Sequence, residues 1–246
     1  MSKIIYSIGD SVVWGAELEN KQEEGFSHYV ANHFGAIDCN NATAGVSNDY
    51  IYRHAVRDIM GWLNDGSIWS EETGWVNGEE LIVVIGWTAP TRFEWWDGKK
   101  YQQERLWSGY DKWGEKDWDR TTEDEFVLHQ TELIPSYIRT FNHIIGIRNI
   151  CDNHNITNIQ FNTFYRYKGL YEPTHKIDTW GREQNQISAP HLWSHLSPTF
   201  TKESMYKWLE ERGGELLPRN HPTKESHYMW SNKIIDLIQE QNEDEF

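Results

Sequence analysis

KIIYSIGDSVVWG, at residues 3–15, is the stretch that decides the fold of this chain. Its apolar run from Ile4 to Ile8 predicts a buried strand that ends at Gly9, where a glycine permits a tight turn. Ser11 then stands at the mouth of a sheet, beside the N-terminus of the next helix. Open α/β sheets place their chemistry at that edge, so Ser11 is the first candidate for a reactive side chain.

The rest of the chain alternates segments with strand and helix periodicity. The clearest buried strand is Glu80 to Ile85, which ends at Gly86. The periodicity also predicts helices over residues 26–34, 48–64, 127–154, 202–212 and 223–241, and strands over 36–40 and 158–164. Strands that alternate with helices imply a parallel sheet.

Two stretches interrupt this alternation. Residues 87–126 mix aromatic, glycine and charged residues over a length too great for an ordinary connection, which predicts an insertion over the edge of the sheet. Residues 165–200 form a second long loop region.

We expect a single domain over residues 1–246. The tryptophans gather between Trp62 and Trp118, where they suit either a glycan-facing platform or a hydrophobic subdomain or oligomer interface.

The net charge of −15 and the isoelectric point near 5.1 argue against nucleic acid and anionic membranes as partners, because both attract basic surfaces. A neutral substrate fits this charge. Cys39 and Cys151 are expected to be reduced structural residues. No apolar run approaches the roughly twenty residues of a membrane span. Since the first strand follows Met1 without room for a signal peptide, we expect a soluble, cytoplasmic protein.

Three further loops follow predicted strands or precede the last helix, and each carries residues suited to catalysis. Gly45 can bring its backbone N–H close to a substrate oxygen. Thr88 comes directly after the buried strand and can aim a hydroxyl at the same edge. His221, held by Pro222 at the entrance of the last helix, is a candidate general base. His227, inside that helix, is a rival whose default role is packing.

A serine near the N-terminus, a glycine in the second loop, a polar residue after the third strand and a His-Pro pair near the C-terminus resemble the SGNH/GDSL hydrolase family. The combination of the short Gly-Asp-Ser start, Ser47-Asn48 and the His-Pro pair also resembles phage-encoded members. The resemblance implies a three-layer α/β/α sandwich of flavodoxin-like type around a mostly parallel sheet. It further implies that Ser11 is the nucleophile, that His221 is the base, and that the N–H groups of Ser11 and Gly45 form an oxyanion hole.

The sequence departs from the family pattern in two places. Where the family has Gly-x-Asn-Asp, this chain has Gly-Trp-Thr-Ala at residues 86–89, so the third oxyanion donor is Thr88, Asn48 or absent. Where the family has an aspartate three positions before the histidine, this chain has Pro218. The group that orients the imidazole is therefore left open between Asn220, Glu215 and a backbone carbonyl.

These residues lead to a serine esterase that acts through an acyl-serine intermediate, without metal or organic cofactor. An O-acetyl group on a carbohydrate is the preferred substrate, and the candidate substrate contacts are Asp10, Trp14, Trp87 and Arg92. The alternative is a non-catalytic glycan-binding or virion-associated structural protein that retains the fold. A phage-encoded protein would act in the virion or host cell. The sequence leaves open the acyl group, the leaving alcohol and any homo-oligomer.

One pair of histidines also has metal-ligand spacing. His191 and His195 are four positions apart, as in metal sites on helices. Pro190 and Pro198 flank the pair and make a regular helix there doubtful, so no metal site is expected.

Overall fold

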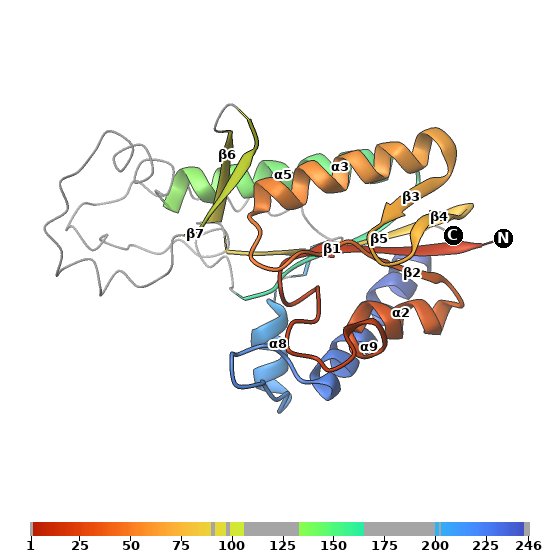
Figure 1. Cartoon of the computed structure of the whole chain (residues 1–246). Coiled ribbons are helices and arrows are strands. Elements are labelled where there is room, and N and C mark those ends of the chain that lie inside the picture. The colour runs from red at the N-terminus through yellow and green to blue at the C-terminus, as the bar shows by residue number, and fades with distance from the viewer. Residues whose placement is uncertain are drawn as a thin grey trace, which may run out of the picture.

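The structure is a computed structural model that describes residues 2–89, 92–96, 99–105, 133–164, 200–201 and 203–243. Its centre is a parallel sheet in the order β2-β1-β5-β8 (Figure 1). The strands are β1 (Lys3–Gly9), β2 (Ile37–Asn40), β5 (Glu80–Trp87) and β8 (Thr157–Asn162). Because all four run in the same direction, their carboxyl ends meet at one edge of the sheet.

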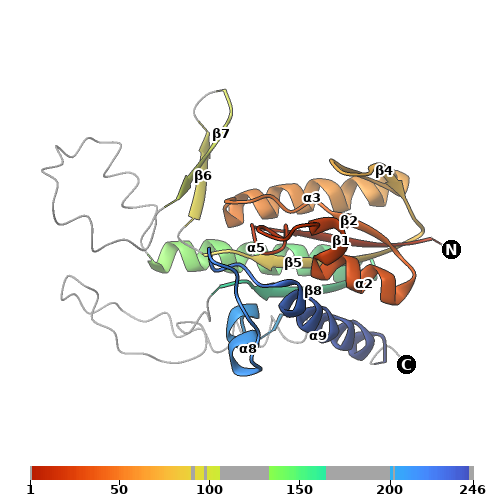
Figure 2. The same ribbon diagram turned by 60° about the horizontal axis from the view of Figure 1, so that its bottom comes forward.

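Helices cover both faces of this sheet. The views in Figures 1 and 2 agree that α3 (Asn48–Asp65) and α5 (Leu133–Asn153) lie on one face, and that α2 (Phe26–Phe34), α8 (Met205–Glu211) and α9 (Lys224–Glu243) lie on the other. A short helix, α1 (Lys21–Glu24), precedes α2. The expected three-layer α/β/α sandwich with a mainly parallel sheet is confirmed.

The two inner strands are buried on both faces, with alternate residues in two separate cores. In β1, Ile4, Tyr6 and Ile8 pack in the core beneath α3 and α5, whereas Ile5 packs in the core beneath α2 and α9. The same alternation holds in β5. A strand buried on both sides reads as a continuous apolar run, which is why the sequence pattern identified these two strands directly.

Two antiparallel hairpins add to the sandwich, and the sequence did not predict them. They are β3 (Ser67–Ser70) with β4 (Gly74–Asn77), and β6 (Arg92–Trp96) with β7 (Tyr101–Arg105). Trp87, where the sequence places the start of an insertion, is the last residue of β5 and lies in the core. The remainder of that insertion, from residue 106, and the loop region from 165 to 199 lie outside the described residues.

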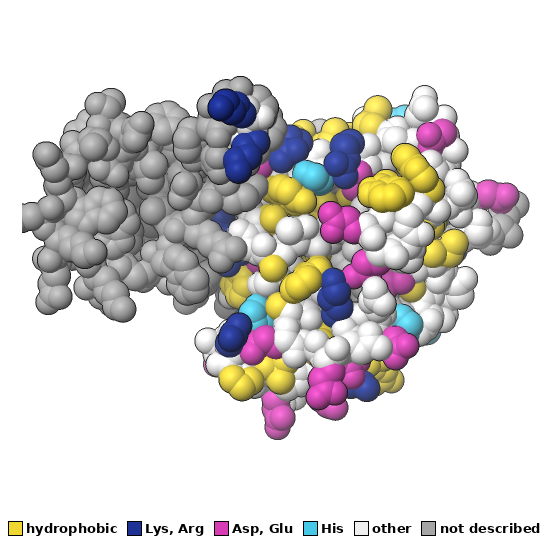
Figure 3. All heavy atoms as spheres, viewed as in Figure 1, with side chains coloured by type: hydrophobic (Ala, Val, Ile, Leu, Met, Phe, Trp, Pro, Cys, Tyr) yellow, Lys and Arg dark blue, Asp and Glu magenta, His cyan; other side chains and the backbone are white. Residues whose placement is uncertain are grey.

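On the face seen in Figure 3, Lys and Arg side chains gather over the β6–β7 hairpin and the neighbouring end of α3. Asp and Glu side chains are spread over the rest of the described surface in that view, and hydrophobic ones lie over the β3–β4 hairpin. Among the described helices, none combines the length and apolarity needed to cross a lipid bilayer.

His227 in α9 belongs to the core. The N-cap residue of α2, Gly25, has no side chain to accept from the first N–H groups of that helix, and the Phe26 N–H instead donates to His227 Nδ1 at 3.3 Å. The imidazole is fully buried and stacks on the Phe26 ring, with centroids 6.1 Å apart. Burial lowers the pKa of His227 from 6.5 to about 3, so this histidine is a neutral structural group.

Replacing His227 with Gln is expected to weaken the acid sensitivity of the fold. Between pH 6.5 and about 3 the unfolded chain binds a proton at His227 and the native protein does not. In the wild type, this group therefore lowers the free energy of unfolding by about 1.4 kcal/mol for each unit by which the pH is lowered. Gln keeps an acceptor for the Phe26 N–H and does not titrate. Urea unfolding at pH 7 and pH 5 measures the free energy of unfolding of both proteins. An equal loss of stability between the two pH values in the wild type and the variant would contradict this prediction.

Candidate active site

Ser11 lies in a wound turn that begins where β1 ends. The Trp14 N–H donates to the Asp10 carbonyl and the Ala16 N–H donates to the Ser11 carbonyl, both at 2.9 Å. These bonds coil residues 10–17 at the carboxyl edge of the sheet, the edge at which open α/β sheets place their ligands.

The turn folds back onto the sheet over two glycines. Gly9 and Gly86 are register partners on β1 and β5, and Val13 sits against both. A Cβ on Gly9 would lie 2.3 Å from Val13 Cγ2 and 2.7 Å from the Gly86 carbonyl oxygen, and one on Gly86 would lie 2.4 Å from the same Val13 atom. No side chain fits at either position without moving the turn.

Asp10 holds the turn from inside and is not a substrate contact, which corrects the expectation from the sequence. Its side chain is fully buried, where Oδ1 accepts from the Val12 N–H at 3.0 Å and Oδ2 accepts from Thr163 Oγ1 at 3.3 Å. Burial raises the pKa of Asp10, against the opposing effect of Arg92, whose Nη1 lies 3.5 Å from Oδ2.

His221 reaches Ser11 from the other end of the chain. Its Nε2 lies 3.0 Å from Ser11 Oγ. The loop that carries it is closed by bonds from the Leu217 N–H to the His221 carbonyl at 2.7 Å and from the Asn220 N–H to the Leu217 carbonyl at 2.8 Å. The structure therefore brings together the two residues that the sequence nominated as nucleophile and base.

The second imidazole nitrogen faces Glu17. His221 Nδ1 lies 2.6 Å from Glu17 Oε2, while Oε1 of the same carboxylate accepts from the Arg219 N–H at 3.2 Å. Partial desolvation raises the pKa of Glu17, but the hydrogen bonds from His221 and Arg219 outweigh it and the pKa lies below its ordinary value. With its proton on Nδ1 donated to Glu17, His221 presents Nε2 as the acceptor for the Ser11 hydroxyl.

Glu17 replaces the orienting groups that the sequence suggested. The Asn220 carbonyl accepts from the Tyr206 hydroxyl, and Glu215 bonds to Ser226 through its backbone. Neither takes the place beside His221 Nδ1. The sequence interpretation missed Glu17 because it compared positions next to the histidine. Asking which carboxylates lie in the turn of the nucleophile itself would have found it.

The loop between β2 and α3 runs beside the end of β1. The Asn41 N–H donates to the Ser7 carbonyl at 2.8 Å and the Thr43 N–H donates to the Gly9 carbonyl at 3.0 Å, which continues the strand pairing past β2. Gly45 follows with φ of 79°, in the left-handed region that glycine adopts readily. Ser47 then caps α3 by accepting from the Tyr50 N–H at 3.2 Å.

Asn48 and Thr88, the two candidates for a third oxyanion donor, bond to each other in a buried joint. Asn48 Oδ1 accepts from the Thr88 N–H at 2.9 Å, and Nδ2 donates to the Thr88 carbonyl at 3.1 Å and to Thr140 Oγ1 at 3.0 Å. Both amide protons are thus committed inside the protein. Thr88 is only 2% exposed, and against the larger effect of burial its side chain lowers the pKa of the neighbouring Asp10 carboxyl.

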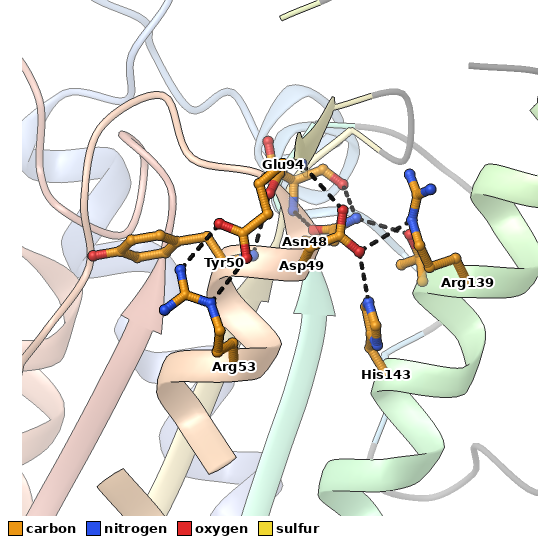
Figure 4. A network of polar contacts seen from close by, with 10 residues as sticks. Asn48, Asp49, Tyr50, Arg53, Glu94, Arg139 and His143 are labelled. Carbon is orange, nitrogen blue, oxygen red and sulfur yellow. Dashed lines mark hydrogen bonds and ion pairs between the residues drawn. The ribbon is translucent and has the colours of Figure 1, made fainter. Parts of the chain in front are cut away.

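A polar network extends this joint outward along α3 (Figure 4). Asp49 Oδ1 lies 2.9 Å from His143 Nε2 and 3.1 Å from Arg139 Nε, while Oδ2 accepts from the Glu94 N–H at 3.3 Å. Arg53 donates two bonds of 3.0 Å to the Glu94 carboxylate. These contacts tie α5 and the β6–β7 hairpin to the first two turns of α3.

The other candidate substrate contacts divide into core and surface. Trp87 is fully buried and its Nε1 donates to Gln160 Oε1 at 3.0 Å, so it is a core residue and not a substrate contact. Trp14 is partly buried, with Lys21 Nζ 4.1 Å from its ring centroid. Arg92 lies over the Phe164 ring, with its Cζ 5.5 Å from the centroid, and pairs with Asp10 as described above.

Within the described ranges, no three His, Cys, Asp or Glu side chains gather in a way that could hold a metal ion. His191 and His195, the pair with metal-ligand spacing, lie outside those ranges.

The sequence matches no protein-family model and no curated protein. Solved structures do match. The esterase EstA from Pseudoalteromonas sp. superposes with a TM-score of 0.51 at 11% identity, over 98% of each chain. That likeness in shape, at so low an identity, concerns the fold alone, the α/β/α sandwich around a mainly parallel sheet.

Two weaker likenesses accompany it. A lipolytic protein of the G-D-S-L family from Veillonella parvula has a TM-score of 0.46 at 8% identity, over 96% of this chain and 97% of the other. A carbohydrate esterase family 2 enzyme plus carbohydrate-binding domain from Corynascus thermopiles (Myceliophthora fergusii) has a TM-score of 0.48 at 12% identity, over 97% of this chain and 66% of the other.

Replacing Gly9 with Ala is expected to destabilise the protein by about 1–3 kcal/mol, because the new methyl group overlaps Val13 and the Gly86 carbonyl. Gly61→Ala is the matched control. Gly61 lies within α3 with nothing within 4 Å of an added Cβ, so this change is expected to stabilise by about 0.5–1 kcal/mol. Urea unfolding measures both; equal effects of the two changes would refute the packing argument.

Proposed function

We propose that this protein is a serine esterase that hydrolyses an ester through an acyl-serine intermediate. The observation that carries the proposal is the continuous chain from Ser11 Oγ to His221 Nε2 at 3.0 Å and from His221 Nδ1 to Glu17 at 2.6 Å. A serine hydroxyl is a poor nucleophile at neutral pH unless a base removes its proton during attack, and an oriented imidazole supplies that base.

In the first half of the reaction, Ser11 Oγ attacks the ester carbonyl carbon while His221 Nε2 takes the hydroxyl proton. Glu17 holds the ring and stabilises the imidazolium that forms. When the carbon–oxygen bond to the alcohol breaks, the imidazolium returns its proton to the leaving oxygen. In the second half, His221 takes a proton from water, the hydroxide attacks the acyl group, and the acid leaves as Ser11 recovers its proton.

The N–H groups of Ser11 and Gly45 are the proposed donors to the oxyanion. Each such donor is commonly worth on the order of 3 kcal/mol of barrier. Gly45 suits this role because its loop is bonded to Gly9, two residues before Ser11. Asn48 commits both amide protons to the Thr88 carbonyl and Thr140 Oγ1, and Thr88 is buried, so this site is proposed to work with two donors.

The preferred substrate is a neutral ester, and more specifically an O-acetyl group on a carbohydrate. The net charge of −15 disfavours an anionic substrate. Trp69 and Trp75, a cross-strand pair on the β3–β4 hairpin, are 47% and 65% exposed with ring centroids 5.7 Å apart. Exposed aromatic faces of this kind suit sugar rings.

Replacing Ser11 with Ala is expected to abolish hydrolysis of p-nitrophenyl acetate, a loss of about 10⁴-fold or more in kcat, since the nucleophile is removed. A fluorophosphonate should label the wild type on the peptide that contains Ser11, whereas Ser67→Ala, on the hairpin, should label and turn over normally. Acetate release from acetylated xylan tests the sugar-ester substrate. A wild type that neither labels nor turns over would instead support the non-catalytic binding protein.

Replacing Glu17 with Gln is expected to lower kcat about 10²- to 10⁴-fold with little change in stability. The neutral amide no longer stabilises the imidazolium and can hold the ring in the wrong tautomer. Glu19→Gln, an exposed acid of the same segment, is the control. Steady-state kinetics on p-nitrophenyl acetate compare the two variants; a Glu17 variant with wild-type kcat would remove Glu17 from the mechanism.

A further inference from the structure

Asn40, the last residue of β2, lies between the two loops that carry the proposed site. Its Nδ2 donates to the Val13 carbonyl at 2.9 Å, in the turn of the nucleophile. Its Oδ1 accepts from the Ala42 N–H at 3.1 Å, in the loop that leads to Gly45. One side chain thus bonds to both segments from which the proposed nucleophile and oxyanion donors come.

The remaining amide proton of Asn40 is fixed by a third element. Nδ2 also donates to Ser27 Oγ at 3.2 Å, and Ser27 Oγ in turn donates to Asp38 Oδ2 at 3.2 Å. Because the single hydroxyl proton of Ser27 points to Asp38, its lone pair is left for Asn40. Ser27 is buried in α2, so this arm anchors Asn40 to the body of the fold.

These contacts require an amide in one orientation. The Val13 carbonyl and Ser27 Oγ each need a donor, and the Ala42 N–H needs an acceptor, so the oxygen and nitrogen of Asn40 cannot exchange places. Asp has the same shape but offers only acceptors when ionised, and would set a negative oxygen against the Val13 carbonyl. A hydroxyl or a methyl group would leave at least one of the three partners without its bond.

We infer that Asn40 is a positioning residue that clamps the Ser11 turn to the Gly45 loop and so sets the distance between the nucleophile and the second oxyanion donor. Asn40 touches no reacting atom; it acts through the backbone of both loops. This inference rests on the proposed function for its catalytic consequence, but the clamp itself is a structural property that can be measured without substrate. Misplacement of such a group by about 1 Å can cost on the order of 100-fold in rate.

The neighbouring Asn41 provides a matched control. Its Nδ2 donates to Asp58 Oδ2 at 3.2 Å and to the Trp69 carbonyl at 2.7 Å, so it ties α3 to the β3–β4 hairpin and not to the Ser11 turn. Asn41→Ala therefore removes a comparable set of side-chain bonds one residue away. Ser27→Ala removes one arm of the clamp and leaves the bonds to Val13 and Ala42 in place.

The first test is hydrogen exchange followed by mass spectrometry on the full chain. In Asn40→Asp, peptides covering residues 10–17 and 41–47 should both exchange at least about tenfold faster than in the wild type, since the clamp is lost from both sides. Asn41→Ala should leave the 10–17 peptide at the wild-type rate. Faster exchange in only one of the two segments, or in neither, would overturn the clamp whether or not the protein is an esterase.

The second test is kinetic, and it separates the clamp from the proposed function. Active sites are counted by titration with a fluorophosphonate, and kcat on p-nitrophenyl acetate is given per site. Asn40→Asp should lower this kcat about 10- to 100-fold, with KM changed by less than about threefold. Ser27→Ala should lower kcat about threefold, and Asn41→Ala should leave it unchanged. A wild type without activity would refute the esterase and leave the exchange result to decide the clamp. An active Asn40→Asp with wild-type kcat per site would overturn the positioning role.

Discussion

The contact of Val13 with the paired glycines Gly9 and Gly86 is the constraint on which the proposed site depends. It lets the chain leave β1, coil at once, and lie against the ends of two strands, at a distance that admits no side chain at either glycine. Ser11 and Glu17 are both members of that coil. The distance between Ser11 and Glu17 is therefore set by local geometry, and the His221 imidazole contacts both from one side.

This arrangement places the proposed nucleophile and the orienting acid on one turn and brings the proposed base from the far end of the chain. Local strain accompanies it: Glu17 has φ of 69°, a conformation that residues other than glycine adopt seldom and at a cost of order 1 kcal/mol. The surrounding contacts hold it there, because the carboxylate accepts from both His221 and the Arg219 N–H. The loop before α9 is thereby attached to the Ser11 turn, with the imidazole between them.

The sequence predicted those parts of the structure that follow from periodicity. The bounds of α2 agree with the prediction, and those of α3 and β5 differ at the C-terminal end alone, by one residue each. The β3–β4 hairpin was missed because its strands are four residues long and show outward tryptophans where alternation leads one to expect polar groups. Asp10 and Trp87 were taken for substrate contacts because their place in the chain is beside the site, whereas burial depends on tertiary packing that no local pattern reports.

The same limit explains the family positions that this chain fills differently. The family pattern places the acid three residues before the histidine, and that position is Pro218 in this chain. The carboxylate beside His221 comes instead from Glu17, more than 200 residues away in sequence. A search by offset from Gly86 reaches Thr88, which the structure engages with Asn48. The two departures are not equivalent. A carboxylate, that of Glu17, does lie beside the His221 imidazole, so the proposed proton transfer keeps its full set of groups.

At the position after β5 where the family pattern places a donor, the backbone of Thr88 bonds to Asn48. Asn48 also bonds to Thr140, so these contacts join the end of β5 to α3 and α5. On the proposed function, a missing third donor costs roughly 3 kcal/mol of oxyanion stabilisation, about a hundredfold in rate, and a rigid joint lies beneath the Gly45 loop instead. Rigidity has catalytic value only if the two remaining donors are held in place. The contacts of Asn40 and Thr43 with the Ser11 turn and the end of β1 hold the Gly45 loop, and with it the second proposed donor, in place.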